Sequence, residues 1–573
     1  MSRAGGPTPA GTGVRPFGDG AFLYETTDVH AAHRLAEAVH RHRRSGRAPT
    51  GIEDVVVGLA SVVVLLDLDD QGTDPERCQE WLSEVVAGQG TGANVDESQT
   101  GPTTRTLVLP TTFDGPDLDA VADAARCTTD RVVALLTSTE LTVAFVGFAP
   151  GFPYLTGLPA ELAAVERRPT PRSTVPAGSV AVAGGFASVY PRPTPGGWHL
   201  VGHTATELFD PVSPPYARVL PGDRVRFADA GRAAAPSRHR SGAVPERPPL
   251  AAHGARFVEV LEPGLLSLVE DGGRRSLAAQ GIPRSGPCDP DTMRLANRLV
   301  GNRDRAAAIE CTASGPTLRC TGDFHLAVVG SVADAVDVRV DGRPVGTDAV
   351  VPVRDGQTVA VGRVRVGLRV YLSVAGGFAT PVTAGSRAAD LLSGLGPGPL
   401  AAGDRLECGP PTAPPRGLLS RPTGALPDRG APTILRIVPG PHGAGGGALQ
   451  WLTATTWRVG GDSNRIGLRL ADPSGRDPVT PGPVPSTGMV TGAVQVPPGG
   501  EPIILMPDHA TVGGYPVVAC VITADLPVLG QLAPGDPVGF AVVGHQTAGK
   551  ARRSASEALG RQVTGWYPTR AGT

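Results

Sequence analysis

The most informative feature of this sequence is how little lysine it contains. Lys550 is the only lysine among 573 residues, so 51 of the 52 basic residues are arginine. A Walker A phosphate loop needs lysine before Ser or Thr, whereas Lys550 is followed by Ala551. Covalent biotin is also carried on a lysine, and Schiff-base chemistry needs a lysine in a desolvated pocket. The chain is therefore predicted to carry no P-loop and no covalent biotin.

Other absences narrow the class of protein further. The seven cysteines are odd in number and include no C-x-x-C pair, which argues against a disulfide framework and against a metal site. The longest apolar run, residues 55–66, is too short to span a bilayer, and no signal peptide is recognised. A formal net charge of −2 gives no reason to expect nucleic acid or an anionic membrane as a partner. We therefore expect a cytoplasmic protein.

The composition favours a mostly β chain. Aromatic residues make up only 4%, whereas 77 glycines and 58 prolines punctuate many valine-rich runs, a pattern typical of short strands and tight turns. A small α+β unit comes first, with helices expected near 29–44 and 75–86 around a hairpin over 54–67. The domains and connections expected from these breaks are the α+β unit 14–87, a β-barrel 105–228, a linker 231–250, a β-barrel domain 255–408, a linker 409–433, a β-barrel 434–543 and a tail 548–573.

Internal echoes indicate that the barrels are related and lie in tandem. A Gly-Asp pair precedes an apolar alternation at the end of each β block, at Gly222-Asp223, Gly403-Asp404 and Gly535-Asp536. A longer series of motifs also occurs twice in the same order. The Val-Pro-containing segment 175–179 is followed by Gly-Gly-Trp at 196–198, and the Val-Pro-containing segment 496–500 is followed by Gly-Gly-Tyr at 513–515.

The first half contains the densest local motif, Gly-Phe-Ala-Pro-Gly-Phe-Pro-Tyr-Leu over 147–155. It is either a rigid turn that closes a barrel end or a rim whose amides and Tyr154 hydroxyl face a ligand. Arg167, Arg168 and Arg172 follow in a proline-stiffened segment that could bind a carboxylate or phosphate. His203 is a candidate proton carrier near a barrel rim.

The second half places further polar groups in turns. Asp271 and Arg274 flank a glycine pair, and Ser386 and Arg387 are adjacent. The helix expected over 291–300 is predicted to pack through its apolar face and to expose Arg294 and Arg298. Two further turns are rich in polar residues, at 463–469 and 508–515. These spacings predict anion-binding barrel rims without naming a reaction.

Taken together, the motifs resemble those of the B and C subunits of 5-oxoprolinase, also known as allophanate hydrolase subunits 1 and 2. The motifs that match the B family run from Gly18-Asp19 through 147–155, Pro171-Arg172, 175–180 and 195–198 to 221–223. Those that match the C family run from Glu270-Asp271 through 295–302, 371–377, Gly385-Ser386-Arg387, 463–465 and 495–497 to 511–515. The resemblance implies a fused protein with cyclophilin-like barrels.

In this family the B and C subunits act with a separate A subunit to open 5-oxo-L-proline to L-glutamate with hydrolysis of ATP. The resemblance thus implies ATP with Mg as cofactor, an A-subunit-like partner and a lactam or amide substrate. Two alternatives stay open: the carboxyltransferase component of a biotin-dependent urea carboxylase, and a non-catalytic regulator of a histidine kinase. Homo-oligomerisation is also left open.

Motifs and resemblance together nominate the site residues. His203, Asp271 and Arg274 are predicted to be catalytic. The residues predicted to bind substrate or anion are Tyr154, Arg167, Arg172, Ser179, Trp198, Ser386, Arg387, Asn464, Arg465, Gln495, Thr511 and Tyr515.

The sequence also departs from the family pattern at several polar positions. Leucine stands at 136 and 141, His203 replaces an arginine, and Glu270 a glutamine. The remaining departures are Ser331-Val332, Ala388-Ala389, the arginine-free segment 394–399 and Thr487. They imply either a changed substrate or weakened catalysis.

Overall fold

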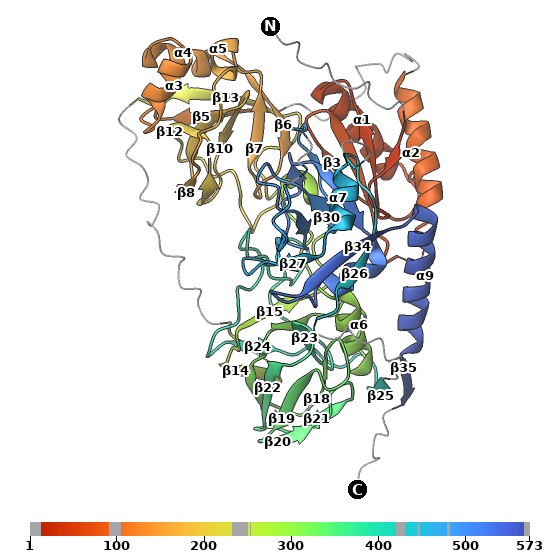
Figure 1. Cartoon of the computed structure of the whole chain (residues 1–573). Coiled ribbons are helices and arrows are strands. Elements are labelled where there is room, and N and C mark those ends of the chain that lie inside the picture. The colour runs from red at the N-terminus through yellow and green to blue at the C-terminus, as the bar shows by residue number, and fades with distance from the viewer. Residues whose placement is uncertain are drawn as a thin grey trace.

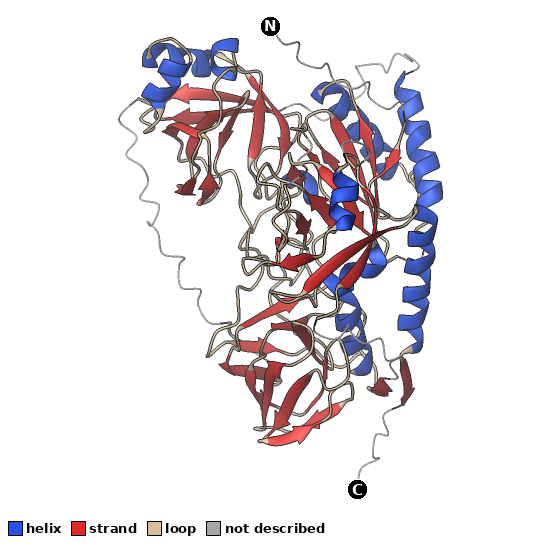
Figure 2. Cartoon of the chain, viewed as in Figure 1, coloured by secondary structure: helices blue, strands red, loops and turns tan. Residues whose placement is uncertain are grey.

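The computed structural model describes residues 13–566, apart from 71, 91–104, 232–249, 253, 420–429, 444–446, 478 and 480–481. Strands dominate, and the helices lie mainly at the upper corners and along one side of the molecule (Figures 1 and 2). The expected architecture, mostly β with a small α+β unit and barrels in tandem, is confirmed. Within these described residues, no helix is both long and apolar enough to cross a membrane.

The N-terminal unit is a four-stranded sheet, in the order β1-β2-β4-β3, covered by two helices. Asp28 caps the first helix by accepting a hydrogen bond from the Ala31 amide, and the helix buries Ala32, Leu35 and Val39. Both expected helices and the expected hairpin are confirmed. The elements are β1 (Arg15–Pro16), β2 (Ala21–Glu25), α1 (Val29–Arg44), β3 (Ile52–Val57), β4 (Ser61–Leu66) and α2 (Pro75–Gly90).

The next module is a seven-stranded sheet in the order β12-β9-β10-β7-β6-β13-β5. A bridge between Thr112, just after β5, and His203 at the end of β12 joins the two edge strands and closes the sheet. The strands are β5 (Thr106–Thr111), β6 (Leu141–Val146), β7 (Pro153–Thr156), β8 (Arg172–Val175), β9 (Ser179–Ala183), β10 (Phe186–Val189), β11 (Thr194–Gly196), β12 (His199–His203) and β13 (Arg224–Asp229), with helices α3 (Leu118–Ala124), α4 (Thr129–Ser138) and α5 (Ala160–Ala163).

The second half begins with two facing sheets, β20-β19-β22-β17-β14-β24 and β15-β16-β23-β18-β21, around a valine-rich core. The strands are β14 (Phe257–Glu262), β15 (Leu266–Glu270), β16 (Ala308–Thr312), β17 (Thr317–Thr321), β18 (Phe324–Val329), β19 (Val336–Val340), β20 (Arg343–Val345), β21 (Val351–Val353), β22 (Thr358–Val364), β23 (Arg369–Val374) and β24 (Arg405–Glu407). The helical turn η1 (Ala278–Gln280) and the helix α6 (Pro290–Leu299) lie between β15 and β16.

A closed seven-stranded barrel follows, in the order β26-β33-β30-β31-β28-β27-β34, at the centre of Figure 1. Its strands are β26 (Thr433–Pro439), β27 (Trp457–Val459), β28 (Gly467–Ala471), β30 (Ala493–Gln495), β31 (Ile503–Leu505), β33 (Val517–Val521) and β34 (Pro537–Val542). Around it lie β29 (Thr487–Gly488), β32 (Val512–Gly513), α7 (Ala448–Ala454), η2 (Thr523–Asp525) and α8 (Leu526–Leu529).

The predicted relationship between the barrels agrees with two features of the structure, the pairing of their first and last strands and the conformation of their Gly-Asp turns. The first and last strands pair in parallel in both seven-stranded modules, β5 with β13 and β26 with β34. Each Gly-Asp echo forms the same turn: the glycines at 222, 403 and 535 have φ near +90°, and each following aspartate accepts a hydrogen bond from the amide three residues earlier. Only glycine adopts that φ without strain.

The C-terminal segment differs from the tail expected at 548–573. Residues His545–Arg561 form α9, which runs along one side of the molecule (Figure 1). β35 (Val563–Trp566) then pairs with β25 (Arg416–Leu419), inside the expected linker 409–433. The apolar contacts of α9 include the small side chains of Ala548 and Ala551, and such residues give a weak hydrophobic pattern in sequence.

Candidate active site at the junction of the two halves

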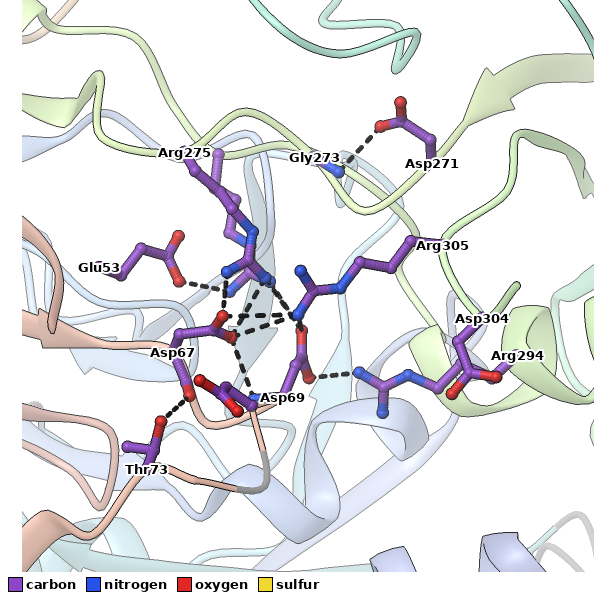
Figure 3. A network of polar contacts seen from close by, with 12 residues as sticks. Glu53, Asp67, Asp69, Thr73, Asp271, Gly273, Arg275, Arg294, Asp304 and Arg305 are labelled. Atoms are coloured by element: carbon purple, nitrogen blue, oxygen red, sulfur yellow. Dashed lines mark hydrogen bonds and ion pairs between the residues drawn. The ribbon is translucent and has the colours of Figure 1, made fainter. Parts of the chain in front are cut away.

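The two halves of the chain, described residues 13–231 and 250–566, meet across a network of acids and arginines (Figure 3). Asp67 and Asp69, just after β4, face arginines of the second half. Asp69 accepts a 2.7 Å hydrogen bond from Arg284 and also pairs with Arg294. Burial alone would raise the pKa of Asp69, but the arginines outweigh it and hold that pKa well below its usual range. The junction is therefore held partly by charge.

Helix α6 supplies two of the paired arginines, so the expectation that Arg294 and Arg298 are exposed is wrong. Arg294 pairs with Asp69 of the first half and with Asp291. Arg298 pairs with Asp304 and donates a 2.9 Å hydrogen bond to the Leu559 carbonyl of α9. The helical pattern identified the apolar face, but Asp69 and the Leu559 carbonyl, which contact the two arginines, come from distant segments.

The turn at 147–152 is packed into this junction. The Gly151 amide donates a 3.0 Å hydrogen bond to the Gln280 carbonyl of the second half. A Cβ at Gly147 would lie 2.6 Å from Val512 Cβ, and one at Gly281 would lie 2.7 Å from the Ala149 carbonyl oxygen. These approaches favour the interpretation of the motif as a rigid turn that joins the halves.

Phe152, the last residue of this turn, belongs to an aromatic cluster around Tyr154. The Tyr154 ring is 4.4 Å from Phe145, 5.2 Å from Phe152 and 5.6 Å from Trp198, measured between centroids. Burial raises the pKa of Tyr154 to about 12, against the opposing charge of Arg167. The Tyr154 hydroxyl is therefore a protonated hydrogen-bond donor at neutral pH.

Two of the three arginines in the stiff segment are already paired. Arg168 Nη1 and Arg172 Nη2 each lie 2.8 Å from Asp117 Oδ1, while Asp117 Oδ2 accepts a hydrogen bond from the Leu200 amide. Arg167 is exposed and, in the part of the chain that the structure describes, has no carboxylate within ion-pair distance. Through Arg168 and Arg172 the segment is joined to Asp117, and through Asp117 to β12 of the barrel.

This pairing leads to a prediction for Arg172→Ala. Because Arg168 still compensates Asp117, the loss of the charge-assisted hydrogen bond should lower the free energy of unfolding by only about 1 kcal/mol. Urea denaturation measures the change, and Arg339→Ala, which removes an exposed pair with Asp337, is the control. A loss of activity without any loss of stability would show that Arg172 contacts the ligand instead.

His203 lies at the seam of the first barrel. Its Nδ1 is 2.8 Å from Asp114 Oδ1, and its backbone bonds with Thr112 close the sheet. Ser179 is its cross-strand partner in β9, so these two predicted site residues are neighbours.

In the second half the structure brings Asp271, Ser386 and Arg387 together. Asp271 accepts hydrogen bonds from the Ser386 hydroxyl, from the Arg387 amide at 2.7 Å and from the Gly273 amide at 2.9 Å. Arg274 is 2% exposed, and its Nη2 donates to the Ala388 carbonyl at 2.5 Å. This turn therefore holds a carboxylate and a guanidinium in fixed positions.

Arg465 belongs to a different environment, a buried ionic cluster between the two modules of the second half. Its guanidinium donates to Asp508 at 2.8 and 3.1 Å and to Glu310 at 2.5 Å. Glu270 Oε1 lies 3.2 Å away, and Arg369 lies 3.3 Å from Glu310. Arg465 is only 3% exposed, so the cluster mainly stabilises packing between the modules.

The charges in this cluster identify Glu270 as its neutral member. Two arginines face three carboxyl groups. Burial raises the pKa of Glu270 well above its usual range despite the charge of Arg465. The pKa of Glu310 is instead held low, because Arg465 and Arg369 outweigh its burial. With Glu270 protonated, two cations balance Glu310 and Asp508.

A pH-dependent prediction follows for Glu270→Gln. A carboxyl group with a raised folded pKa is ionised only in the unfolded chain, so between its unfolded pKa of about 4.5 and its folded pKa the wild type loses stability as pH rises. The variant has no such group. Its advantage over the wild type in urea denaturation should grow by roughly 1.4 kcal/mol per pH unit from pH 5 up to the folded pKa of Glu270, and then level off. An advantage independent of pH would show that Glu270 is ionised in the folded protein.

The remaining predicted residues do not form one group. Asn464 is exposed and caps its own turn by accepting from the Ile466 amide, while Tyr515 is 43% exposed. Gln495 in β30 donates to Met489 Sδ at 3.1 Å. Thr511 is buried, with a hydroxyl that has no hydrogen-bond partner among the described residues.

Three residues with clear roles in these contacts were not predicted from the sequence, namely Asp117, Glu310 and Arg369, and neither was Arg192, whose guanidinium lies against Gly394 of the second half. Glu310 had a visible signal, because it is a lone acid inside the apolar strand β16, where a charge needs a buried partner. No sequence signal marked Arg192, because the loop that it contacts belongs to the other half of the chain.

Two family models cover most of the chain. Residues 12–219 match the carboxyltransferase domain, subdomain C and D, and residues 280–542 match the carboxyltransferase domain, subdomain A and B. The crystal structure of TTHA0988 in space group P212121 is similar over 92% of this chain and 100% of that chain, with a TM-score of 0.76 and 32% identity.

Relatives of known name match each half separately. The C subunit of 5-oxoprolinase from Escherichia coli K12 is 34% identical over 307 residues, which are 52% of this chain and 94% of that protein. The B subunit of 5-oxoprolinase from Escherichia coli O157:H7 is 39% identical over 181 residues, 31% of this chain and 77% of that protein. Urea amidolyase of Lachancea kluyveri is 31% identical over 331 residues, but these are only 18% of its length.

Proposed function

Because the chain belongs to the carboxyltransferase-domain family and joins counterparts of the B and C subunits of 5-oxoprolinase in one polypeptide, we propose that it is a component of an ATP-dependent 5-oxoprolinase. In this role it acts with a separate A-subunit-like protein and opens the lactam of 5-oxo-L-proline to L-glutamate. The observation that carries the proposal is that one chain matches nearly the full length of the C subunit as well as three quarters of the B subunit.

The junction offers the groups that opening a lactam requires. Asp271 is held by three hydrogen bonds, so its carboxylate is oriented and can accept a proton. The buried Arg274, three residues along the same turn, can hold an anionic group of the substrate. Tyr154 is a protonated donor in the aromatic cluster of the first half. We propose these three residues as the core of the site, with His203 assigned to the barrel seam.

ATP supplies the activation of the amide in this proposal, and Mg accompanies it. No group of three or more His, Cys, Asp or Glu side chains placed to hold a metal ion occurs in the described parts of the chain. The described residues thus offer no dedicated metal cage, and Asp271, Arg274 and Tyr154 act in this proposal without one.

Reconstitution tests the proposal. The purified chain is mixed with an A-subunit-like protein, Mg-ATP and 5-oxoproline, and released glutamate is measured. We expect glutamate only when both proteins and ATP are present. Absence of glutamate from a complex that does form would contradict the proposal.

The urea amidolyase relatives give the second candidate, a carboxyltransferase component. Adding urea, a biotin carboxylase and carboxybiotin carrier to the same chain distinguishes it, because consumption of carboxybiotin would depend on urea. Urea-dependent consumption without glutamate release would favour this candidate. Failure of the chain to associate with either set of partners would favour the histidine-kinase regulator.

A further inference from the structure

Arg274 is a buried cation that forms no ion pair with the described residues, although Asp390 and three other carboxyl groups act on its charge from beyond ion-pair distance. It is 2% exposed, and its one side-chain hydrogen bond among the described residues goes from Nη2 to a neutral acceptor, the Ala388 carbonyl. Its Nε and Nη1 are buried with no hydrogen-bond partner there. An unpaired buried charge is costly, so such groups are normally paired or bind a ligand.

Asp390 is the acid whose charge acts most strongly on Arg274, but its oxygens already accept hydrogen bonds from residues of its own loop. Asp390 accepts hydrogen bonds from the Leu392 amide at 2.9 Å, from the Ser393 amide at 3.1 Å and from the Ser393 hydroxyl. No ion pair joins Asp390 to Arg274 in the described part of the chain. The loop therefore holds Asp390 through its own donors, and Nε and Nη1 of Arg274 keep no hydrogen-bond partner among the described residues.

A second arginine reaches the same loop from the other half of the chain. Arg192 follows β10, and a Cβ at Gly394 would lie only 2.6 Å from its Nη2. A Cβ at Gly396 would likewise lie 3.0 Å from Nη2 of Arg274. Because two residues span at most about 7 Å, both guanidinium groups lie against one short stretch. Arg192 is half-buried and makes no hydrogen bond or ion pair with the described residues.

The geometry points to a composite anion subsite: we propose that Arg192 of the first half and Arg274 of the second bind one small carboxylate at the junction. Guanidinium groups match a carboxylate through paired N–H donors, and two of them can hold its two oxygens. Naming the ligand as the carboxylate of 5-oxoproline or a similar lactam acid rests on the proposed function. The subsite exists only when both halves are docked.

Binding of small ligands to the intact chain tests the subsite. Calorimetric titrations use 5-oxoproline, acetate, inorganic phosphate and 2-pyrrolidinone, which is the same lactam without a carboxylate. The variants are Arg192→Gln and Arg274→Met, with Arg339→Gln at an exposed position of β19 as the matched control. We expect 5-oxoproline to bind at least tenfold more weakly to each site variant and unchanged to the control, and 2-pyrrolidinone to be insensitive to all three.

Thermal unfolding without ligand separates a binding role from a structural one. If Arg274 awaits an anion, Arg274→Met removes an unpaired buried charge and should leave the Tm equal to or higher than that of the wild type. Arg192→Gln keeps the test valid if the buried variant folds poorly. A marked fall in Tm for Arg274→Met together with unchanged binding in Arg192→Gln would overturn the proposal.

The outcomes also distinguish this proposal from the proposed function. If acetate binds through both arginines but 5-oxoproline does not, the subsite stands and the 5-oxoprolinase role fails. If phosphate binds in preference to every carboxylate, the carboxylate assignment is overturned. If no anion binds, the subsite is overturned whatever the glutamate assay shows.

Discussion

Replacing Arg465 with methionine is expected to lower the free energy of unfolding by about 3–5 kcal/mol, the cost of removing one partner from a buried ionic group. Arg465 joins Asp508, after β31, to Glu310 in β16, and all three are at most 3% exposed. Without Arg465, Glu310 keeps Arg369 as its partner, but Asp508 loses the arginine with which it pairs. Urea denaturation followed by circular dichroism measures the loss.

Glu270→Gln is the matched control for this prediction, because it changes the same cluster without removing a charge. Its side chain keeps its size, and the protonated Glu270 is already neutral. At pH 5 its stability should be within about 0.5 kcal/mol of the wild type. Equal effects of Arg465→Met and Glu270→Gln would contradict the assignment of charges.

Charge reversal at Asp69 is expected to have the second large effect. Asp69 lies within ion-pair distance of four arginines, at positions 275, 284, 294 and 305. Arginine at this position would place a fifth cation among four and weaken docking of the halves by several kcal/mol, since like charges at an interface repel strongly. Limited proteolysis and the thermal unfolding profile should show the two halves separating into distinct transitions.

Asp337→Arg is the control for this reversal, because it removes an equally charged side chain from an exposed pair with Arg339. Exposed pairs contribute about 0–1 kcal/mol, so its unfolding should remain a single transition. High salt should reduce the effect of Asp69→Arg by screening the repulsion. An Asp69→Arg variant that unfolds as the wild type does would show that apolar contacts alone hold the junction.

Local chemistry explains which features the sequence could predict. The Gly-Asp turns were recognisable because a positive φ and a capping carboxylate require those two residue types together. Helix α1 was recognisable from its apolar period. The pairing of β5 with β13 in parallel could only be inferred through the repeat, because their partners are more than a hundred residues apart.

The candidate site was only partly predictable for a related reason. Asp271, Arg274, Ser386 and Arg387 come from two motifs that the structure brings together. Arg192 and the acids of the junction network act across segments hundreds of residues apart, so no local pattern marks them. For Arg172, the stiff basic segment predicts an anion site, and the structure shows that this arginine already pairs with Asp117. Its contact with a substrate anion stays a prediction.

Two departures from the family pattern also have a structural explanation. Glu270 replaces a glutamine, and a protonated carboxyl group is neutral and close to glutamine in shape, so the buried cluster tolerates it. Thr487 accepts a 2.7 Å hydrogen bond from the Ser61 hydroxyl of β4 and so joins the closed barrel region to the N-terminal unit. These substitutions preserve packing and leave the proposed junction site in place.

The most direct test of the junction as the working site is glutamate release by the chain cut into its two halves. Residues 1–240 and 241–573, co-expressed, should associate and, with the A-subunit-like protein and Mg-ATP, release glutamate from 5-oxoproline as the intact chain does. Either half alone should be inactive, and Asp69→Arg in the first half should remove association and activity together. Full activity from one half alone would contradict a site shared between the halves.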